Sequence, residues 1–128
     1  GWRVALVARR VADMQHWASS QGWPAGQWAV YEADVRDEAA IAAAAQACMA
    51  TQGLPDVVVA NAGISIGMET ADFDDLEVMR ATFETNNLGM AATFHPFVAA
   101  MRERGSGISH ELVQSLGLER GRSLCMSR

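Results

Sequence analysis

Three short apolar runs, set apart by stretches of helical periodicity, constrain the fold of this chain more than any other feature. The runs lie at residues 4–8, 28–31 and 56–60, and the last contains three consecutive valines. Short runs of this kind, rich in β-branched residues, are typical of strands that are covered on both faces of a sheet. We therefore predict three strands, with room for a helix between each and the next.

The sequence between the runs has the three- and four-residue spacing of amphipathic helices. Apolar residues recur over residues 11–18 until Gly22 ends the pattern, and an alanine-rich stretch over residues 41–49 ends before Gly53. Asp37 is a favourable N-cap for this second helix. Strands that alternate with helices predict an α/β fold, with a parallel sheet and helices on both of its faces.

A third periodic stretch runs from about residue 74 to residue 104. Its apolar positions form a single stripe, which consists of Leu76, Met79, Phe83, Met90, Phe94, Phe97 and Met101. The stripe predicts one long buried face, and we expect Gly89 and Pro96 to bend or divide the helix. The periodicity fails from residue 108 onward. We therefore expect a domain over residues 1–107 and a divergent, poorly ordered tail over residues 108–128.

The balance of charges argues against several classes of partner. The chain has 15 acidic and 10 basic residues, all ten of them arginine, and a formal net charge of -5. Nucleic acid and anionic membranes bind clustered positive charge, so we expect neither as a partner.

The two cysteines lie far apart and the three histidines share no ligand spacing, so we expect no disulfide, no metal site and a cytoplasmic location. No apolar run approaches the length of a membrane-spanning helix.

Polar residues follow each predicted strand, at the edge where parallel α/β sheets bind ligands. Arg9 and Arg10 leave the first strand and suit an anionic group such as a phosphate; solvated loop arginines are the alternative. Asp34 can accept a hydrogen bond from an adenine amino group while the Val35 backbone contacts the ring, or it can serve as a turn or capping residue. Asn61-Ala62-Gly63 lets a ligand approach the backbone closely, or forms a tight turn.

Two adjacent asparagines interrupt the apolar stripe of the third helical stretch. Asn86 and Asn87 lie three and four residues after Phe83, so at least one amide falls on the stripe. A buried amide needs hydrogen-bond partners, because leaving it without them costs about 1–3 kcal/mol. A helix end, a bound water or a proton relay would supply partners, and an asparagine at a helix kink is the structural alternative.

The order and spacing of these residues resemble a known family. The ordered set comprises Ala8-Arg9-Arg10, Asp34-Val35, Asn61-Ala62-Gly63, Thr85-Asn86-Asn87-Leu88-Gly89, Pro96 and Met101. With this set, residues 1 to about 107 resemble the middle of a short-chain dehydrogenase/reductase, a Rossmann-type oxidoreductase that uses NAD or NADP. The resemblance implies that Asp34 and Val35 hold the adenine and that Asn61-Ala62-Gly63 lies beside the cofactor. It also implies that Asn86 is the active-site asparagine, whose main-chain carbonyl holds a water in the relay to a catalytic lysine.

The resemblance also carries expectations about cofactor and partners. Arg9 follows Ala8 at a position where NAD-preferring members carry an acid, which implies NADP(H) rather than NAD(H). An intact member would transfer a hydride between the nicotinamide and a small-molecule alcohol or carbonyl substrate. It would also form a homo-oligomer through the helices over residues 76–101.

The chain departs from the family in several respects. The family's glycine-rich turn and its strand would precede Gly1, and we expect cofactor affinity to collapse without them. Because that strand lies in the middle of the family's sheet, we also expect two sheet pieces with unpaired edges. The sequence has no lysine, and its single tyrosine, Tyr31, lies on the wrong strand for catalysis. The match ends after Gly107, as a shifted reading frame or a truncation would explain. We therefore expect an inactive, incomplete copy of the enzyme; the alternative is a non-catalytic protein-interaction module.

Overall fold

A computed structural model of the chain describes residues 1–67, 71, 73–111 and 123–127. Its strands are β1 (Arg3–Ala8), β2 (Trp28–Glu32), β3 (Val57–Ala60), β4 (Ile108–Glu111) and β5 (Ser123–Ser127). Its helices are α1 (Val11–Ser20), α2 (Glu38–Gln52), α3 (Asp75–Phe83), the π-helical turn η1 (Glu84–Leu88) and α4 (Gly89–Arg104). The three predicted strands and the helices between them are confirmed.

A capping side chain and two glycines explain where α2 and α4 begin and end. Asp37 caps α2, since its Oδ1 accepts a hydrogen bond from the Ala40 N–H at 3.0 Å, as predicted. Gly53, with φ 84°, follows α2, and Gly105, with φ 72°, follows α4. Glycine adopts positive φ at little cost, so the chain can turn sharply there and enter the next strand.

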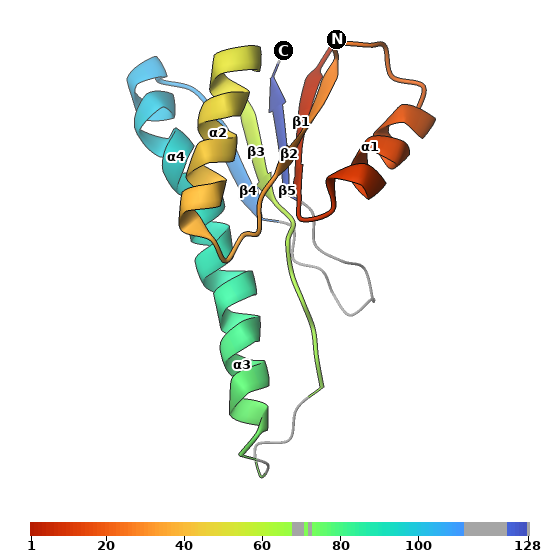
Figure 1. The fold of residues 1–128 in the computed structure, drawn as a ribbon. Helices are drawn as coiled ribbons and strands as arrows, with labels where there is room; N and C mark the ends of the chain where they lie inside the picture. Colours follow the sequence, from red (N-terminus) through yellow and green to blue (C-terminus); the bar gives the residue numbers. More distant parts are fainter. Residues whose placement is uncertain (68–70, 72, 112–122, 128) are drawn as a thin grey trace.

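Five strands form one sheet in the order β2-β1-β5-β3-β4 (Figure 1). β1 pairs in parallel with β2, and β3 pairs in parallel with β4. β5 lies between the two pairs and runs antiparallel to both neighbours, with Cys125 in register with Ala5 of β1 and Val58 of β3. The expectation of two sheet pieces with unpaired edges is therefore wrong, because an extended strand of either direction can pair with both edges. The fold class, a partial Rossmann-type α/β fold, is confirmed, and the sheet is mixed rather than purely parallel because β5 runs antiparallel.

Two parts of the segment after Gly107 lie in the sheet. Within residues 108–128, which are expected to be poorly ordered, Ile108–Glu111 and Ser123–Ser127 are strands of the sheet. Residues 112–122 and 128 lie outside the described residues. β4 pairs with β3 alone, and its Ile108 and Ser109 are exposed. Polar side chains are tolerated there because an edge strand needs a backbone partner on one side and can face water.

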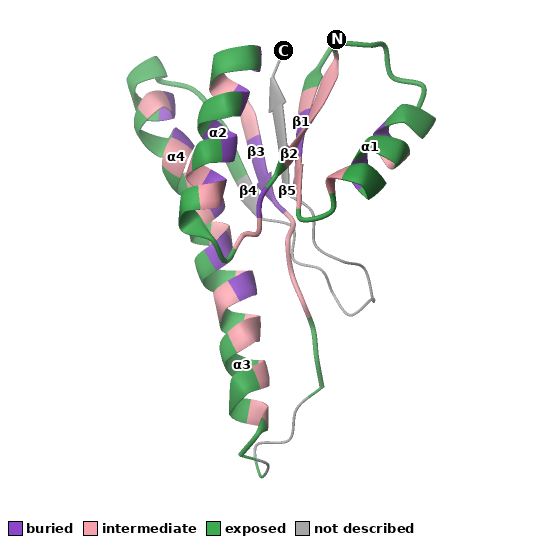
Figure 2. Cartoon of the chain, in the orientation of Figure 1, coloured by how far each residue is buried: buried purple, intermediate pink, exposed green. Residues whose placement is uncertain are grey.

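Apolar side chains are buried on both faces of the sheet (Figure 2). On one face, α2 and α4 cover β1 and β3, and the buried cluster consists of Ala5, Ala45, Cys48, Val58, Phe97 and Met101. On the other face, α1 packs on β1 and β2 through Leu6, Met14 and Ala18. Helices therefore lie on both faces, as predicted. The α2–α4 layer also joins the β1–β2 pair to the β3–β4 pair.

The long third helical stretch is irregular at a position that the sequence did not indicate. The helix continues through Gly89 and Pro96, and the irregularity is η1, where the Gly89 N–H donates to the Glu84 carbonyl. The prediction of one long buried face holds for Phe97 and Met101 in α4 but is wrong for α3, which has no buried residue. Figure 1 shows the reason: α3 extends past the carboxyl edge of the sheet.

Candidate functional site

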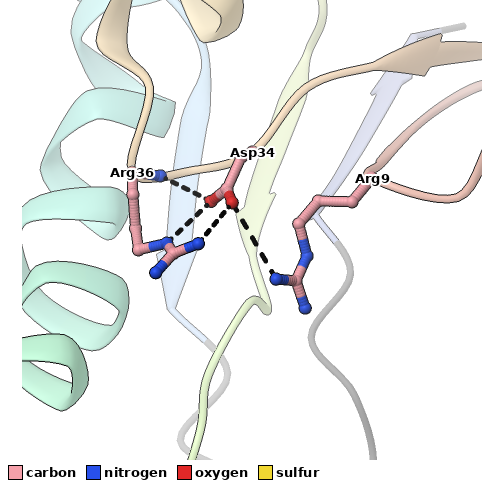
Figure 3. A network of polar contacts seen from close by, with 3 residues as sticks. All are labelled: Arg9, Asp34 and Arg36. Atoms are coloured by element: carbon pink, nitrogen blue, oxygen red, sulfur yellow. Dashed lines mark hydrogen bonds and ion pairs between the residues drawn. The ribbon is translucent and has the colours of Figure 1, made fainter. Parts of the chain in front are cut away.

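Three charged side chains meet at the carboxyl ends of β1 and β2 (Figure 3). Asp34 follows β2, and its carboxylate accepts two hydrogen bonds from the Arg36 guanidinium, Nε to Oδ1 at 3.2 Å and Nη2 to Oδ2 at 2.9 Å. Oδ1 also accepts from the Arg36 backbone N–H at 3.0 Å. Arg9 follows β1, and its Nη1 lies 3.9 Å from Asp34 Oδ2, which is within ion-pair range but beyond a hydrogen bond.

The charges of this cluster do not cancel. The hydrogen bond from the Arg36 side chain lowers the pKa of Asp34 below its ordinary value, against a smaller opposing effect of burial, so the carboxyl group is ionised at neutral pH. The same contact raises the pKa of Arg36. These three side chains together have a formal charge of +1, and the negative charge of Glu84 also acts on Arg36. Arg9 is the most exposed of the three side chains, since 61% of its side chain is exposed.

The structure brings Arg9 into this cluster and leaves Arg10 out of it. Arg10 turns to its own helix, where its Nε pairs with Asp13 Oδ2 at 3.1 Å. Asp34 has the turn role that the sequence left open, through its contact with the Arg36 backbone. Sequence reasoning missed Arg36, although a guanidinium two residues after an aspartate at a strand end is a readable signal for such a pair.

The next residue, Val35, lies directly against the start of α4. A Cβ built on Gly89 would lie 2.8 Å from Val35 Cγ2, 2.9 Å from its Cβ and 3.2 Å from its carbonyl oxygen. The absence of a side chain at Gly89 thus lets α4 approach the loop that follows β2. Gly89 is therefore a position of close packing, not the bend that is expected from the sequence.

Asn86 ties η1 to the segment that follows β3. Its Oδ1 accepts a hydrogen bond from the Ile64 N–H at 2.8 Å, and its Nδ2 donates to the Ile64 carbonyl at 2.9 Å. Both polar groups of one residue's backbone are thereby satisfied by one carboxamide. Asn86 is half-buried and Asn87 is exposed, so Asn86 is the asparagine that turns inward. Turns of π-helix are frequent at functional sites.

These contacts connect the predicted site residues along one edge of the sheet. The Ala33 N–H donates to the Ala8 carbonyl at 3.3 Å and holds the ends of β1 and β2 together. Val35 then touches Gly89, which lies three residues from Asn86 on the same helical stretch. Asn61-Ala62-Gly63 leaves β3 immediately before Ile64. The predicted site residues therefore lie along the carboxyl edge on both sides of β5, and Arg10 takes no part in the cluster with Asp34.

Other chemically active groups have structural partners. The Tyr31 hydroxyl lies 2.6 Å from Thr51 Oγ1 of α2, so it is engaged with the helix layer. Cys48 is in the core, and burial raises the pKa of its thiol.

Among the residues that the structure describes, no group of three or more His, Cys, Asp or Glu side chains is placed to hold a metal ion. None of the helices within the described ranges is long and apolar enough to cross a membrane.

Comparison with known proteins gives consistent matches. The profile of the short chain dehydrogenase family matches residues 1–109. The chain is 38% identical over 90 residues to the 17-beta-hydroxysteroid dehydrogenase type 1 of Mus musculus, covering 70% of this chain and 25% of that protein. It is 29% identical over 107 residues to the NADP-dependent 3-hydroxy acid dehydrogenase YdfG of Shigella flexneri, covering 84% of this chain and 42% of that protein. It thus spans less than half the length of these relatives.

A solved structure matches the fold as well. The closed form of a serine dehydrogenase complexed with NADP+ is similar with a TM-score of 0.71 and 28% identity, covering 82% of this chain and 41% of that chain. The family profile covers most of the chain, and the residues quoted for the resemblance lie inside the matched range. The chain therefore belongs to the short-chain dehydrogenase family.

Proposed function

We propose that this chain carries the adenosine end of the cofactor site of an NADP(H)-dependent oxidoreductase that acts on an alcohol or ketone. The cluster of Arg9, Asp34 and Arg36 is the observation that carries the proposal. Arg9 is the most exposed member of this cluster, at 61% against 44% for Arg36, and a guanidinium suits the 2'-phosphate that distinguishes NADP(H) from NAD(H). The NADP dependence in the name of the Shigella relative agrees with this assignment.

The described residues fit the adenosine end of a dinucleotide. The Asp34 carboxylate accepts three hydrogen bonds, so about one of its four lone-pair sites remains for an adenine amino group. Val35 follows it and would lie against the ring. Gly63 has no side chain, so Asn61-Ala62-Gly63 offers backbone to a ligand at the end of β3. When bound, the nicotinamide supplies or accepts the hydride.

We assign Asn86 two roles in the same site. Its side chain positions the segment after β3, because it holds both backbone groups of Ile64. Its main-chain carbonyl is the group that would hold the relay water, as the family resemblance implies.

Turnover requires groups that this 128-residue chain lacks. General acid catalysis in the family uses a tyrosine whose pKa is lowered by a lysine, and this sequence contains no lysine. Its single tyrosine, Tyr31, is bonded to α2. We propose that the chain as given is inactive. We also propose a cytoplasmic location, on the basis of its two widely separated cysteines.

A second candidate function, protein interaction, is favoured by the exposed apolar face of α3. Leu76, Met79 and Phe83 are 47%, 44% and 57% exposed and lie at steps of three and four residues. Exposed apolar side chains that share one helix face are typical of surfaces that bind another protein. A homo-oligomer through this helix is the form we propose, and light scattering over a concentration series would measure it.

The proposed function is tested by titrating the purified chain with NADPH and following the nucleotide's fluorescence, with circular dichroism on the same sample. We expect saturable but weak NADPH binding by a folded chain, because the proposed site holds only the adenosine end of the cofactor. We expect no hydride transfer to carbonyl compounds. A cooperatively folded chain that does not bind NADPH would overturn the cofactor assignment. NADPH-dependent reduction of a carbonyl compound would overturn the assigned inactivity and leave the cofactor assignment standing.

A further inference from the structure

The hydrogen bonds on Asp34 are distributed unequally between its two neighbouring arginines. Arg36 donates three hydrogen bonds to the carboxylate, two to Oδ1 and one to Oδ2. Arg9 provides no hydrogen bond to it and stays 3.9 Å from Oδ2. An ionised carboxylate has about four lone-pair sites, so Arg36 fills most of its accepting capacity.

We propose that Arg36 is a specificity-determining residue that keeps Arg9 available for a phosphate. The inference rests on the proposed NADP(H) function. With Arg36 in place, the negative charge of Asp34 is balanced and its best hydrogen-bonding positions are filled. Arg9 therefore stays extended toward solvent, with 61% of its side chain exposed.

Without Arg36, the same carboxylate would act against phosphate binding in two ways. Asp34 would draw the Arg9 guanidinium into a fork-shaped ion pair, since Arg9 already lies within ion-pair distance. Its uncompensated charge would also repel a phosphate held nearby. Arg36 thus acts through Asp34, although it need not touch the nucleotide itself.

The competing explanation is that Arg36 binds the phosphate directly. Its side chain is 44% exposed, so a ligand can reach it. Its Nε and Nη2 both face Asp34, however, which leaves it fewer free donors than Arg9 has. The two explanations predict different phosphate binding when the Asp34 charge is also removed from a variant that lacks Arg36. Binding recovers if Arg36 acts through Asp34, and it stays weak if Arg36 binds the phosphate itself.

The experiment compares the affinities of adenosine 2',5'-bisphosphate and adenosine 5'-monophosphate by calorimetry. The preference for the bisphosphate is the ratio of the two dissociation constants. Arg36→Ala is expected to lower this preference about fivefold, the size of effect for a solvent-exposed charged contact. In the double variant Asp34→Asn with Arg36→Ala, the preference is expected to return to within about twofold of the wild-type value. The amide of asparagine keeps a hydrogen-bond acceptor but has no charge.

A second variant and a second measurement distinguish the proposed effect on Arg9 from a loss of binding caused by misfolding. Arg36→Lys keeps the positive charge but cannot form the fork, so its preference is expected to lie between wild type and Arg36→Ala. In Arg36→Ala, the ¹⁵N signal of the Arg9 side chain is expected to report a new hydrogen bond to Asp34. When Asp34→Asn is added to this variant, that hydrogen bond is expected to weaken. Circular dichroism verifies that each variant is folded.

The outcomes separate the possible failures. An unchanged preference in folded Arg36→Ala overturns the inference and leaves the proposed function intact. A double variant as impaired as Arg36→Ala overturns it in favour of direct phosphate binding by Arg36. A wild-type chain that binds both nucleotides equally, or neither, overturns the proposed cofactor preference and this inference with it.

Discussion

Gly89 and Val35 are in such close contact that an added Cβ at Gly89 would fall 2.8 Å from Val35 Cγ2. The contact joins the start of α4 to the loop after β2, which also holds Asp34. Two effects oppose each other when Gly89 becomes alanine. Alanine is the better helix former by about 1 kcal/mol, whereas forcing a methyl group into a filled space typically costs about 1–3 kcal/mol.

We predict that steric overlap dominates in Gly89→Ala, because one of the close atoms is the Val35 carbonyl oxygen, which is backbone. The variant is expected to be destabilised by about 1 kcal/mol, measured by urea unfolding. Gly67→Ala is the control, since a Cβ there meets no atom of the described residues within 4 Å, and it is expected to be nearly neutral. A Gly89→Ala variant more stable than wild type would contradict the packing role.

Asn86→Ala is predicted to loosen the segment after β3. The substitution removes two hydrogen bonds and leaves both backbone groups of Ile64 without this partner, at a cost of about 1–3 kcal/mol. Asn87→Ala, at the exposed neighbour, is the matched control and is expected to change stability little. Hydrogen exchange at the Ile64 amide measures the effect directly. Equal exchange in the two variants would show that the Asn86 side chain does not hold this segment.

The pKa of Asp34 predicts how stability depends on pH. The value is lowered in the folded chain from an ordinary 3.8, chiefly by the Arg36 side chain. A lowered carboxyl pKa stabilises the fold at pH values above the ordinary one, and this contribution is lost as pH falls through the folded value. The stability difference between wild type and Asp34→Asn is therefore expected to be constant near neutral pH and to shrink below about pH 4.

NMR titration of the Asp34 carboxyl carbon provides the site-specific measurement. In Arg36→Ala its pKa is expected to move upward, because the largest lowering contact is gone. A titration midpoint for Asp34 in wild type at or above its ordinary value would contradict the ion pair as described.

β5 is predicted to hold the two parallel strand pairs in one sheet. Cys125 pairs with Ala5 on one side and Val58 on the other, and a proline in a central strand removes a ladder hydrogen bond. Cys125→Pro is expected to lower the unfolding midpoint and broaden the transition, whereas Cys125→Val keeps the backbone donor. Superimposable unfolding curves for Cys125→Pro and Cys125→Val would show that β5 does not close the sheet.

The sequence predicted the parts of this fold that depend on local pattern. Three valines in β3 and the capping aspartate Asp37 each have a local physical signature, and the structure confirms both. The position of β5 had no such signature, because pairing with β1 and β3 is a long-range choice between distant segments. Likewise the stripe through Leu76 shows that a helix has an apolar face but does not show what covers that face.

In the candidate site, too, the sequence predicted the features with a local signature and missed those that depend on long-range contacts. Strand ends located Arg9, Asp34 and Asn61-Ala62-Gly63, since ligands of parallel sheets meet the chain there. Periodicity located Asn86 but not its partner, because contact with Ile64 spans 22 residues of sequence. The π-helical turn that aims Asn86 at Ile64 has no marker in the residues themselves.

The central claim is that Arg9 selects a 2'-phosphate, and the most direct test compares two neighbouring arginines. Arg9 and Arg10 are 61% and 59% exposed, but Arg10 pairs with Asp13 and lies outside the cluster. Titrations with NADPH and NADH are expected to show that Arg9→Ala loses about fivefold or more in NADPH affinity with little change for NADH, while Arg10→Ala changes neither. Equal effects of the two substitutions, or equal loss for both nucleotides in Arg9→Ala, would contradict the account.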